Sequence, residues 1–476
     1  MLEKIFKLKE NGTDVKTEVI AGLTTFMTMA YIIALNPNLL TGFTANGGQE
    51  LWNAVFLATC IASAFGTILM AYIANKPFAM SAGMGLNSFF AVVVANIATI
   101  AGVSYLEGFR AGLCIILIEG IVFVILSVLN VREKIVQAIP LGVRLGISPA
   151  IGLMLLNIGF GSNAGVYSET GGPFYAMANF FGSLTASYAK DTMGSGYPVM
   201  VLTVITMFVG LFTIVALDHK KVKGSVLYGI LTGTVIYWAG EYFVLHINPF
   251  ASLATASWLP PFKDMTALTL FKFDFNVLKS LGMFTVVTLV LTFCIIDMFD
   301  TIGTLVGTAS RANMLDENGN MPNMKEALIS DACGTVCGAL TGTSTITTFV
   351  ESASGVEAGG RTGLTSLVTG LIFLACMFIS PIAAIIPAAA TSSALIYVGI
   401  LMLQGLKNID FDDISVCVPV FIMLVAMPIS GSIGHGIGLG IIAYTIIKFI
   451  TGKAKEVSPL TLVLSILFLV KFFFAF

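Results

Sequence analysis

Apolar stretches of membrane-spanning length recur along this chain from Thr17 to Phe476. Each is close to the roughly 20 residues that cross a bilayer as a helix. Of the 476 residues, 57% are hydrophobic and only 11% are charged, whereas soluble domains carry about 25% charged residues. So few charges cannot cover the surface of several soluble domains. The sequence therefore predicts an all-α polytopic membrane protein and excludes a soluble enzyme and a disulfide-linked scaffold.

Hydropathy in windows of about 19 residues predicts about 14 transmembrane segments. They fall near residues 17–37, 52–74, 78–98, 109–129, 138–158, 197–217, 224–245, 281–308, 327–342, 343–357, 362–386, 391–405, 414–430 and 432–450. One further apolar stretch, 457–475, is left unplaced. By the positive-inside rule the N-terminus is expected in the cytoplasm of a multi-pass protein of the cell membrane. That expectation depends on four lysines near the first span, Lys4, Lys7, Lys9 and Lys16.

The predicted outer loop 246–280 divides the spans into two sets of seven, in residues 1–245 and 281–476. Because seven is odd, a second copy of the first set enters the membrane upside down, as in inverted-repeat transporters. Short internal matches favour such a duplication. Gly152 follows Ile139-Pro140 at the same offset at which Gly399 follows Ile386-Pro387.

Two predicted spans do not have the pattern of continuous helices. In span three, Gly83 and Gly85 precede Asn87, and the segment is expected to become helical only after Asn87. In span ten, a run rich in Thr and β-branched residues precedes Glu351. Both segments indicate a short extended stretch leading into a half-helix, and a pair of such segments points to a transporter's binding site. The alternative is two packing helices rich in small residues.

Carboxylates at membrane depth are a further signal of function. Asp297 and Asp300 lie three apart in span eight and share a helix face. A charge at the membrane centre costs at least ~2.5 kcal/mol, so such residues usually face a cavity. The alternative for Asp300 is a helix cap at the cytoplasmic interface. For Glu119, Asp331 and Arg144, structural pairing or interface roles are favoured.

The remaining composition limits partners and cofactors. The net charge is −2, so no basic surface is available for nucleic acid. The seven cysteines lie in apolar runs. Cys333 and Cys337 are four residues apart, but no third Cys or His lies nearby in the sequence, so packing is favoured over a metal site. No cofactor and no metal are expected.

Several motifs together resemble the AzgA-like purine permeases of the nucleobase–cation symporter-2 family. The most specific run from Asp297 to Thr365 and include Asp297-Met-Phe-Asp300-Thr-Ile-Gly-Thr and Thr343-Ser-Thr-Ile-Thr-Thr-Phe-Val-Glu351-Ser-Ala-Ser-Gly-Val. The others are Phe6-Lys-Leu-Lys-Glu-Asn-Gly, Gly22-Leu-Thr-Thr-Phe-Met-Thr-Met-Ala-Tyr-Ile, Gly83-Met-Gly-Leu-Asn87 and Gly359-Gly-Arg-Thr-Gly-Leu-Thr. The resemblance extends over nearly the whole chain.

The resemblance implies a transporter, not an enzyme. It implies 14 spans in two inverted repeats and proton-coupled uptake of guanine, hypoxanthine or adenine by alternating access. Spans 1–4 and 8–11, about residues 17–129 and 281–386, would form a core domain. Spans 5–7 and 12–14, about residues 138–245 and 391–450, would form a gate domain. The energy source would be the proton gradient, and a homodimer is one candidate assembly.

The resemblance carries Asn87, Asp297, Asp300 and Glu351 into the predicted site. Guanine's N1–H and amine form a parallel donor pair that a single carboxylate can accept, and Glu351 is the predicted acceptor. Asp297 or Asp300 is expected at a second ring edge, and Asn87 at a donor–acceptor contact. The Asp297/Asp300 pair is the predicted proton-coupling group, because like charges favour holding one proton.

Neighbours of these groups complete the predicted site. Thr348 and Phe349 are assigned to substrate binding, and Phe349, Phe78 or Phe299 is the candidate for stacking on the purine ring. Each of these phenylalanines has an ordinary alternative as a core or lipid-facing residue.

Other functions stay open at this stage. A carrier of uracil, xanthine or an inorganic anion could use the same inverted-repeat design, since helix N-termini bind anions. Carboxylates around the site argue against an anion. A membrane hydrolase would need a nucleophile–base pair or a metal cluster, and neither is evident. The sequence does not exclude a channel. It also does not decide the preferred purine, the coupling ion (H⁺ or Na⁺) or the separate roles of Asp297 and Asp300.

Overall fold

The computed structural model describes most of the chain. The described residues are 2–42, 44–129, 140–163, 196–222, 224–254, 256–311, 314, 321–430 and 433–474. Ile139, in the predicted Ile-Pro pair, and residues 138–139 at the predicted start of the fifth span lie outside them. The chain divides into two compact units, each described here by itself.

Unit 1 consists of Met1–Arg144, Leu259–Ser380 and Ile441–Phe476. Its first-half elements are α1 Leu2–Phe6, α2 Val15–Met29, α3 Ile32–Leu40, α4 Gly48–Leu69, η1 Met70–Ala74, β1 Met80–Ala82, α5 Met84–Ala101 and α6 Tyr105–Val128. Its later elements are α13 Phe262–Leu268, α14 Phe275–Ser280, α15 Met283–Arg311, α16 Met324–Thr341, β2 Ile346–Thr348, α17 Ser352–Glu357, α18 Gly363–Ala375, η6 Cys376–Ile379, η8 Ala454–Glu456 and α23 Pro459–Phe474.

Unit 2 consists of Leu145–Trp258 and Pro381–Gly440. Its elements are α8 Leu141–Ile158, η2 Gly159–Asn163, α11 Tyr197–His219, α12 Ser225–Phe243, η5 Ala251–Ala254, α19 Ser380–Ala384, α20 Ala388–Leu403, η7 Gln404–Asn408 and α21 Ile414–Ser430. Helix α22, Ile433–Ile450, contributes residues to both units, and the first residues of α8 and α19 also fall in unit 1. The assignment of core and gate roles to parts of the chain stays a prediction.

Nine helical segments within the described residues are long and apolar enough to cross a membrane. They are Val15–Leu40, Gly48–Ala74, Met84–Ala101, Tyr105–Val128, Gly142–Gly161, Tyr197–His219, Met283–Ile302, Gly363–Ala384 and Ala388–Lys407. Shorter apolar helices are Ile414–Ser430, Gly434–Ile450 and Pro459–Val470. A mostly helical, multi-pass membrane protein is thereby confirmed. The count of 14 spans and the inverted repeats stay predictions.

The apolar stretch 457–475, which the sequence left unplaced, forms α23 over most of its length. Helix α23 packs against α15. It is also joined to α22, where the hydroxyl oxygens of Thr445 and Ser465 lie 2.6 Å apart. This helix is therefore attached to unit 1.

The two interrupted segments pair with each other. Strands β1 and β2 are antiparallel, with Ser81 opposite Thr347 at the centre of the pair. The Gly83 N–H donates to the Thr345 carbonyl (3.1 Å), and so extends the pairing beyond the strands. The predicted short extended stretches are thus confirmed, each followed by a helix, and their pairing satisfies backbone groups that lipid could not. The assignment of these helices as half-helices stays a prediction.

The predicted start of the helix in span three, after Asn87, is wrong by four residues. Helix α5 begins at Met84, and Asn87 already lies in its first turn. Gly83 keeps an extended backbone (φ −64°, ψ 123°) and is the last residue before the helix. The Asn87 N–H donates to the Gly83 carbonyl (2.8 Å), so the helical hydrogen bonds begin as soon as the strand ends.

Threonines from two helices bond the outer edges of the strand pair. Thr67 of α4 accepts from the Met80 N–H (2.9 Å) and lies 3.0 Å from the Met80 carbonyl. Thr335 of α16 donates to the Ile346 carbonyl (3.0 Å). One strand of each half is therefore held by a threonine from the helix that precedes it in the sequence.

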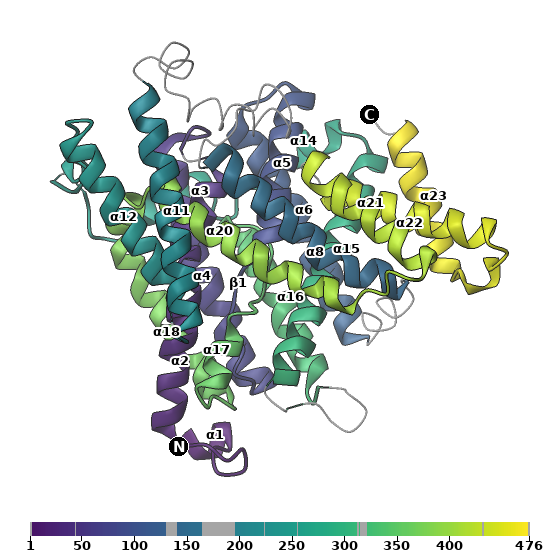
Figure 1. Ribbon diagram of the computed structural model, residues 1–476, viewed down its shortest axis with the longest axis horizontal. Helices are drawn as coiled ribbons and strands as arrows, with labels where there is room; N and C mark the ends of the chain where they lie inside the picture. The colour runs from purple at the N-terminus through teal and green to yellow at the C-terminus, as the bar shows by residue number, and fades with distance from the viewer. Residues whose placement is uncertain are drawn as a thin grey trace. The chain divides into compact units, whose positions relative to one another are not determined.

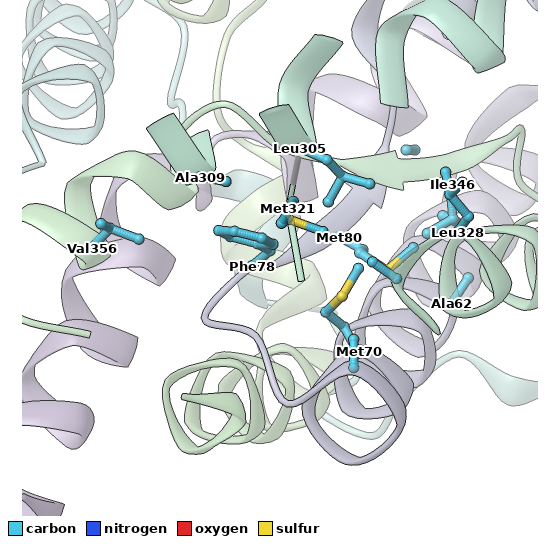
Figure 2. Close-up of a cluster of buried hydrophobic side chains, with 13 residues drawn as sticks. Ala62, Met70, Phe78, Met80, Leu305, Ala309, Met321, Leu328, Ile346 and Val356 are labelled. Atoms are coloured by element: carbon cyan, nitrogen blue, oxygen red, sulfur yellow. The ribbon is translucent and has the colours of Figure 1, made fainter. Parts of the chain in front are cut away.

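A glycine precedes each of these threonines and allows close packing. A Cβ atom added to Gly66 would lie 3.5 Å from the Gly334 Cα, and one added to Gly334 would lie 3.2 Å from the Met80 side chain. Met80 and Ile346 belong to a buried hydrophobic cluster that also contains Phe78 (Figure 2). The strand pair thus has one apolar face, buried against α4 and α16.

Helix α2 is fixed to α18 by a buried carboxylate. Glu18, which is 0% exposed, accepts from the N–H groups of Arg361 (2.8 Å) and Thr365 (3.0 Å) and from the Thr365 hydroxyl (2.7 Å). The first N–H groups of a helix have no partner within it, and a carboxylate there is favourable. Helix α2 accordingly packs against α18, and it also packs against α17 (Figure 1).

In unit 2, Gly152 of α8 and Gly399 of α20 face each other. A Cβ added to Gly399 would lie 2.6 Å from the Gly152 carbonyl oxygen, and one added to Gly152 would lie 2.7 Å from the Gly399 carbonyl oxygen. The contact is therefore reciprocal. It joins the two glycines that occupy equivalent positions in the short internal match, each at the same offset after an Ile-Pro pair.

Replacement of Gly399 by Ala is expected to lower the melting temperature of the purified protein in detergent, because the new methyl group would overlap the Gly152 carbonyl. Overpacking of this kind costs about 1–3 kcal/mol. Gly196→Ala is the control, since a Cβ there meets no described atom within 4 Å. Equal melting temperatures for the two variants would contradict the close contact.

Candidate functional site

Asn87 joins the two interrupted segments. Its side chain is fully buried, and its Nδ2 donates to the Ala82 carbonyl at the end of β1 (3.1 Å). Its Oδ1 accepts from the hydroxyl of Ser344, which precedes β2. Both ends of the amide are therefore bonded within the protein in this conformation, and contact with a substrate stays a prediction.

The residues on either side of Ser344 are held in the same way. Asn36 of α3 donates from Nδ2 to the Thr343 hydroxyl oxygen (2.8 Å). The Thr345 hydroxyl donates to Oε2 of Glu119 in α6 (3.0 Å). Glu119 is 0% exposed. The expected structural role of Glu119 is consistent with this contact, whereas Asn36 was not identified from the sequence.

A hydroxyl lies between two buried carboxylates beside the strand pair. The Thr301 hydroxyl oxygen is 3.0 Å from Oδ1 of Asp297, and 3.0 and 3.1 Å from the two carboxylate oxygens of Asp331. It is also 2.7 Å from the Thr347 hydroxyl oxygen in β2. Asp297 and Asp331 are both 0% exposed. Asp297 and Asp331 of α16 thus lie together beside the strand pair, and a role of Asp297 in substrate binding or proton coupling stays a prediction.

Asp300 lies at the end of β1. A Cβ added to Gly83 would be 3.5 Å from Oδ2 of Asp300. The charge of Asp300 interacts with those of Asp331 and Glu351. The alternative role as a helix cap does not hold, because α15 continues well beyond Asp300 to Arg311.

Glu351 immediately precedes α17 and is partly exposed. Its Oε1 accepts a short hydrogen bond, 2.6 Å, from the hydroxyl of Tyr31, which lies between α2 and α3. The predicted purine acceptor therefore has a protein donor on one of its oxygens. Tyr31 was not singled out from the sequence.

The strand pairing distinguishes Thr347 from Thr348. Successive side chains of a strand point to opposite faces, and directly opposite residues share a face. Thr348 lies opposite Met80, a member of the hydrophobic cluster, and is 2% exposed. Thr347 is the residue whose hydroxyl reaches Thr301. A substrate role for Thr348 stays a prediction, and Thr347 is the nearer of the two to the carboxylates.

The aromatic candidates differ in their surroundings. Phe349 is 5% exposed, and its N–H donates to the Ala79 carbonyl (3.0 Å) at the end of the strand pair. Phe78 is fully buried in the hydrophobic cluster (Figure 2), which leaves no free ring face for a ligand in this conformation. The side chain of Phe299 lies outside what the structure describes. Stacking of Phe349 on a ligand stays a prediction.

In the part of the chain that the structure describes, no group of three or more His, Cys, Asp or Glu side chains is arranged to hold a metal ion. The carboxylates near the strand pair are instead connected through hydroxyl groups. Such an arrangement suits proton exchange and hydrogen bonding to a neutral ligand.

A comparison with known proteins places the chain among transport proteins. The model of a permease family matches residues 16–433. The chain is 37% identical over 475 residues to the adenine permease AdeP of Escherichia coli, a match that covers 100% of this chain and 96% of that protein. It is 36% identical over 473 residues to the guanine/hypoxanthine permease PbuO of Bacillus subtilis, covering 98% of this chain and 100% of that protein.

Among solved structures, the fold is similar to the transmembrane domain of the bicarbonate transporter BicA from a cyanobacterium. The TM-score is 0.60 at 14% identity, and the match covers 88% of this chain and 97% of that chain. Similarity at this identity concerns the fold alone. The sequence matches, in contrast, are strong over nearly the full length. The chain therefore belongs to the permease family, which confirms the resemblance to purine nucleobase permeases carried by its motifs.

Proposed function

We propose that this protein imports purine nucleobases across the cell membrane by proton symport with alternating access. The observation that carries the proposal is the gathering of Asp297, Asp300, Asp331 and Glu351 at the paired strands of two broken segments. Full-length similarity to adenine and guanine/hypoxanthine permeases supports a purine as the substrate. Broken segments at membrane depth are where transporters bind their substrates.

The carboxylate of Glu351 is the proposed contact for the donor edge of the purine. The N1–H of guanine or hypoxanthine would donate to it, and guanine would add its exocyclic amine. Asp300, at the end of β1, would meet a second ring edge. Phe349 is the proposed aromatic neighbour of the ring. Asn87 would act by holding the two segments together.

The geometry around Thr301 supports proton coupling, because the Thr301 hydroxyl has fewer hydrogens than it has carboxylate neighbours. The Thr301 hydroxyl has one hydrogen, yet its oxygen lies 3.0 Å from carboxylate oxygens of both Asp297 and Asp331. It can donate to only one of them. The second contact becomes a hydrogen bond when the other carboxyl carries a proton and donates it to Thr301. We therefore place the coupled proton on this pair, with Asp300 as its neighbour.

Like charges give a reason for the proton to enter with the substrate. Asp300 interacts with the charges of Asp331 and Glu351, and adjacent carboxylates titrate as a coupled group. A proton taken up from outside would reduce their mutual repulsion and favour binding of a neutral base. Its release inside would then accompany release of the base.

The membrane arrangement is part of the same proposal. The N-terminus would lie in the cytoplasm, and 14 spans would form two inverted repeats with core and gate domains. The matched Gly66-Thr67 and Gly334-Thr335 contacts with β1 and β2 support a repeat of this kind. Assembly as a homodimer is a further candidate property.

An inorganic anion is the second candidate substrate, because BicA, a bicarbonate transporter, has a similar fold. The carboxylates at the strand pair argue against it, since they would repel an anion. Uptake of purine should therefore be saturable and inhibited by unlabelled purines, and it should be insensitive to bicarbonate.

The Asp300→Asn variant is expected to lose proton coupling. In liposomes containing the purified parent protein, uptake of labelled hypoxanthine should rise when the outside is made more acidic than the inside. In the variant the gradient should no longer stimulate uptake, because the Asp297/Asp331 pair loses the neighbouring like charge that favours holding the coupled proton. If uptake by the variant follows the imposed gradient as in the parent, Asp300 is not part of the coupling group.

Thr301→Val removes the hydroxyl between Asp297 and Asp331 with little change of shape. We expect gradient-driven accumulation of hypoxanthine to fall about ten-fold, equivalent to about 1.4 kcal/mol, or roughly one hydrogen bond. Exchange of labelled for unlabelled hypoxanthine, which needs no net proton movement, should be less affected.

Thr292→Val is the matched control for this experiment. Thr292 is also buried on α15, but its hydroxyl donates to the Thr288 carbonyl of its own helix (2.7 Å). Accumulation by this variant should stay close to that of the parent. Equal losses in the two variants would show that Thr301 has no special part in coupling.

A further inference from the structure

The motif Gly22-Leu-Thr-Thr-Phe-Met-Thr-Met-Ala-Tyr-Ile has no role in the function proposed so far, yet its tyrosine reaches the site. Tyr31 is 3% exposed. Its hydroxyl lies 2.6 Å from Oε1 of Glu351. An ionised carboxylate only accepts hydrogen bonds, so the phenol is the donor, and such charge-assisted bonds are among the stronger ones in proteins.

The backbone on both sides of this hydrogen bond is held in place. The hydroxyl oxygens of Thr28 and Ser354 lie 2.9 Å apart, and Ser354 donates to the Glu351 carbonyl (2.7 Å). One turn earlier in α2, Thr25 packs against Gly355 so closely that a Cβ at Gly355 would overlap its hydroxyl. The last turns of α2 and the residue Tyr31 thus contact the start of α17 at three successive points, through Tyr31, Thr28 and Thr25.

At the far end of α2, the buried Glu18 bonds this helix to the start of α18. Tyr31 therefore lies just beyond the end of a helix that is fixed near both ends. Its phenol can serve as a fixed donor that orients the Glu351 carboxylate.

We infer that Tyr31 is a positioning residue that fixes the rotation of the Glu351 carboxylate and so sets the donor edge of the purine that the site accepts. The inference rests on the proposed function. Because the phenol occupies one acceptor position of Oε1, the remaining acceptor positions of the carboxylate keep a defined direction. A ligand N–H then meets an acceptor whose orientation is established before binding.

The same hydrogen bond determines which group of a glutamine side chain at position 351, the carbonyl oxygen or the NH₂, would face the ligand. In a Glu351→Gln variant, the Tyr31 hydroxyl would hold the amide carbonyl oxygen and turn the NH₂ group away from it. The group offered to the ligand would change from an acceptor to a donor. Preference should then move from hypoxanthine, whose N1 carries a hydrogen, towards adenine, whose N1 is an acceptor.

Tyr31→Phe tests the positioning role in transport. In liposomes, the KM for hypoxanthine is expected to rise about ten-fold while Vmax stays within about two-fold, since an oriented charged hydrogen bond is lost and the ring remains. The control is Tyr105→Phe, which removes a hydroxyl that donates to the Leu40 carbonyl (2.7 Å) in the same unit. Its KM should equal that of the parent.

A double-mutant cycle gives a readout that a structural role would not change. Binding of hypoxanthine and adenine is measured by calorimetry on the purified parent, Tyr31→Phe, Glu351→Gln and the double variant. The change in the hypoxanthine/adenine ratio caused by Glu351→Gln should be several-fold smaller when Tyr31 is absent, because the amide is then free to rotate.

The outcomes separate the two proposals. If the parent takes up no purine, the proposed function fails and the inference fails with it. If the parent takes up hypoxanthine but Tyr31→Phe has the same KM as Tyr105→Phe, or if the cycle is additive, the role of Tyr31 fails and the proposed function stands.

Discussion

Pairing between β1 and β2 is the interaction on which the rest of the site depends. An extended backbone inside a membrane must find hydrogen-bond partners in the protein. Here each broken segment supplies partners for the other, and Thr67 and Thr335 bond their outer edges. The pair brings the middle of α15 and the start of α17 next to the first half of the chain. Carboxylates from distant parts of the sequence can therefore share one site.

Small and hydroxyl-bearing residues make this arrangement compact. Glycine next to threonine in α4 and again in α16 lets helices approach the strands while the hydroxyl bonds the backbone. Gly152 and Gly399 meet in unit 2 by a similarly close contact. Matched contacts in the two halves are what a duplicated sequence would produce, because each copy keeps the residues that its fold requires.

Sequence reasoning identified the breaks and the charged residues but not their partners. Asp297, Asp300 and Glu351 stand out because a charge at membrane depth is costly and therefore rare. Hydroxyls are common in membrane helices, so Tyr31 and Thr301 gave no comparable signal. The register of β1 and β2 cannot be derived from three-residue strands, so the sequence points to Thr348, whereas Thr347 is the residue whose hydroxyl contacts Thr301. For Asp331 of α16 the sequence favours a structural or interface role. Its contact with Thr301 of α15 joins two helices and is not visible in the sequence spacing.

The central claim is that a purine and a proton move together. The most direct test uses liposomes that contain the purified protein and an internal pH-sensitive dye, with equal pH on both sides. Addition of hypoxanthine outside should acidify the interior at a rate that saturates at the same hypoxanthine concentration as uptake itself. Saturable hypoxanthine uptake with no change of internal pH would contradict the account.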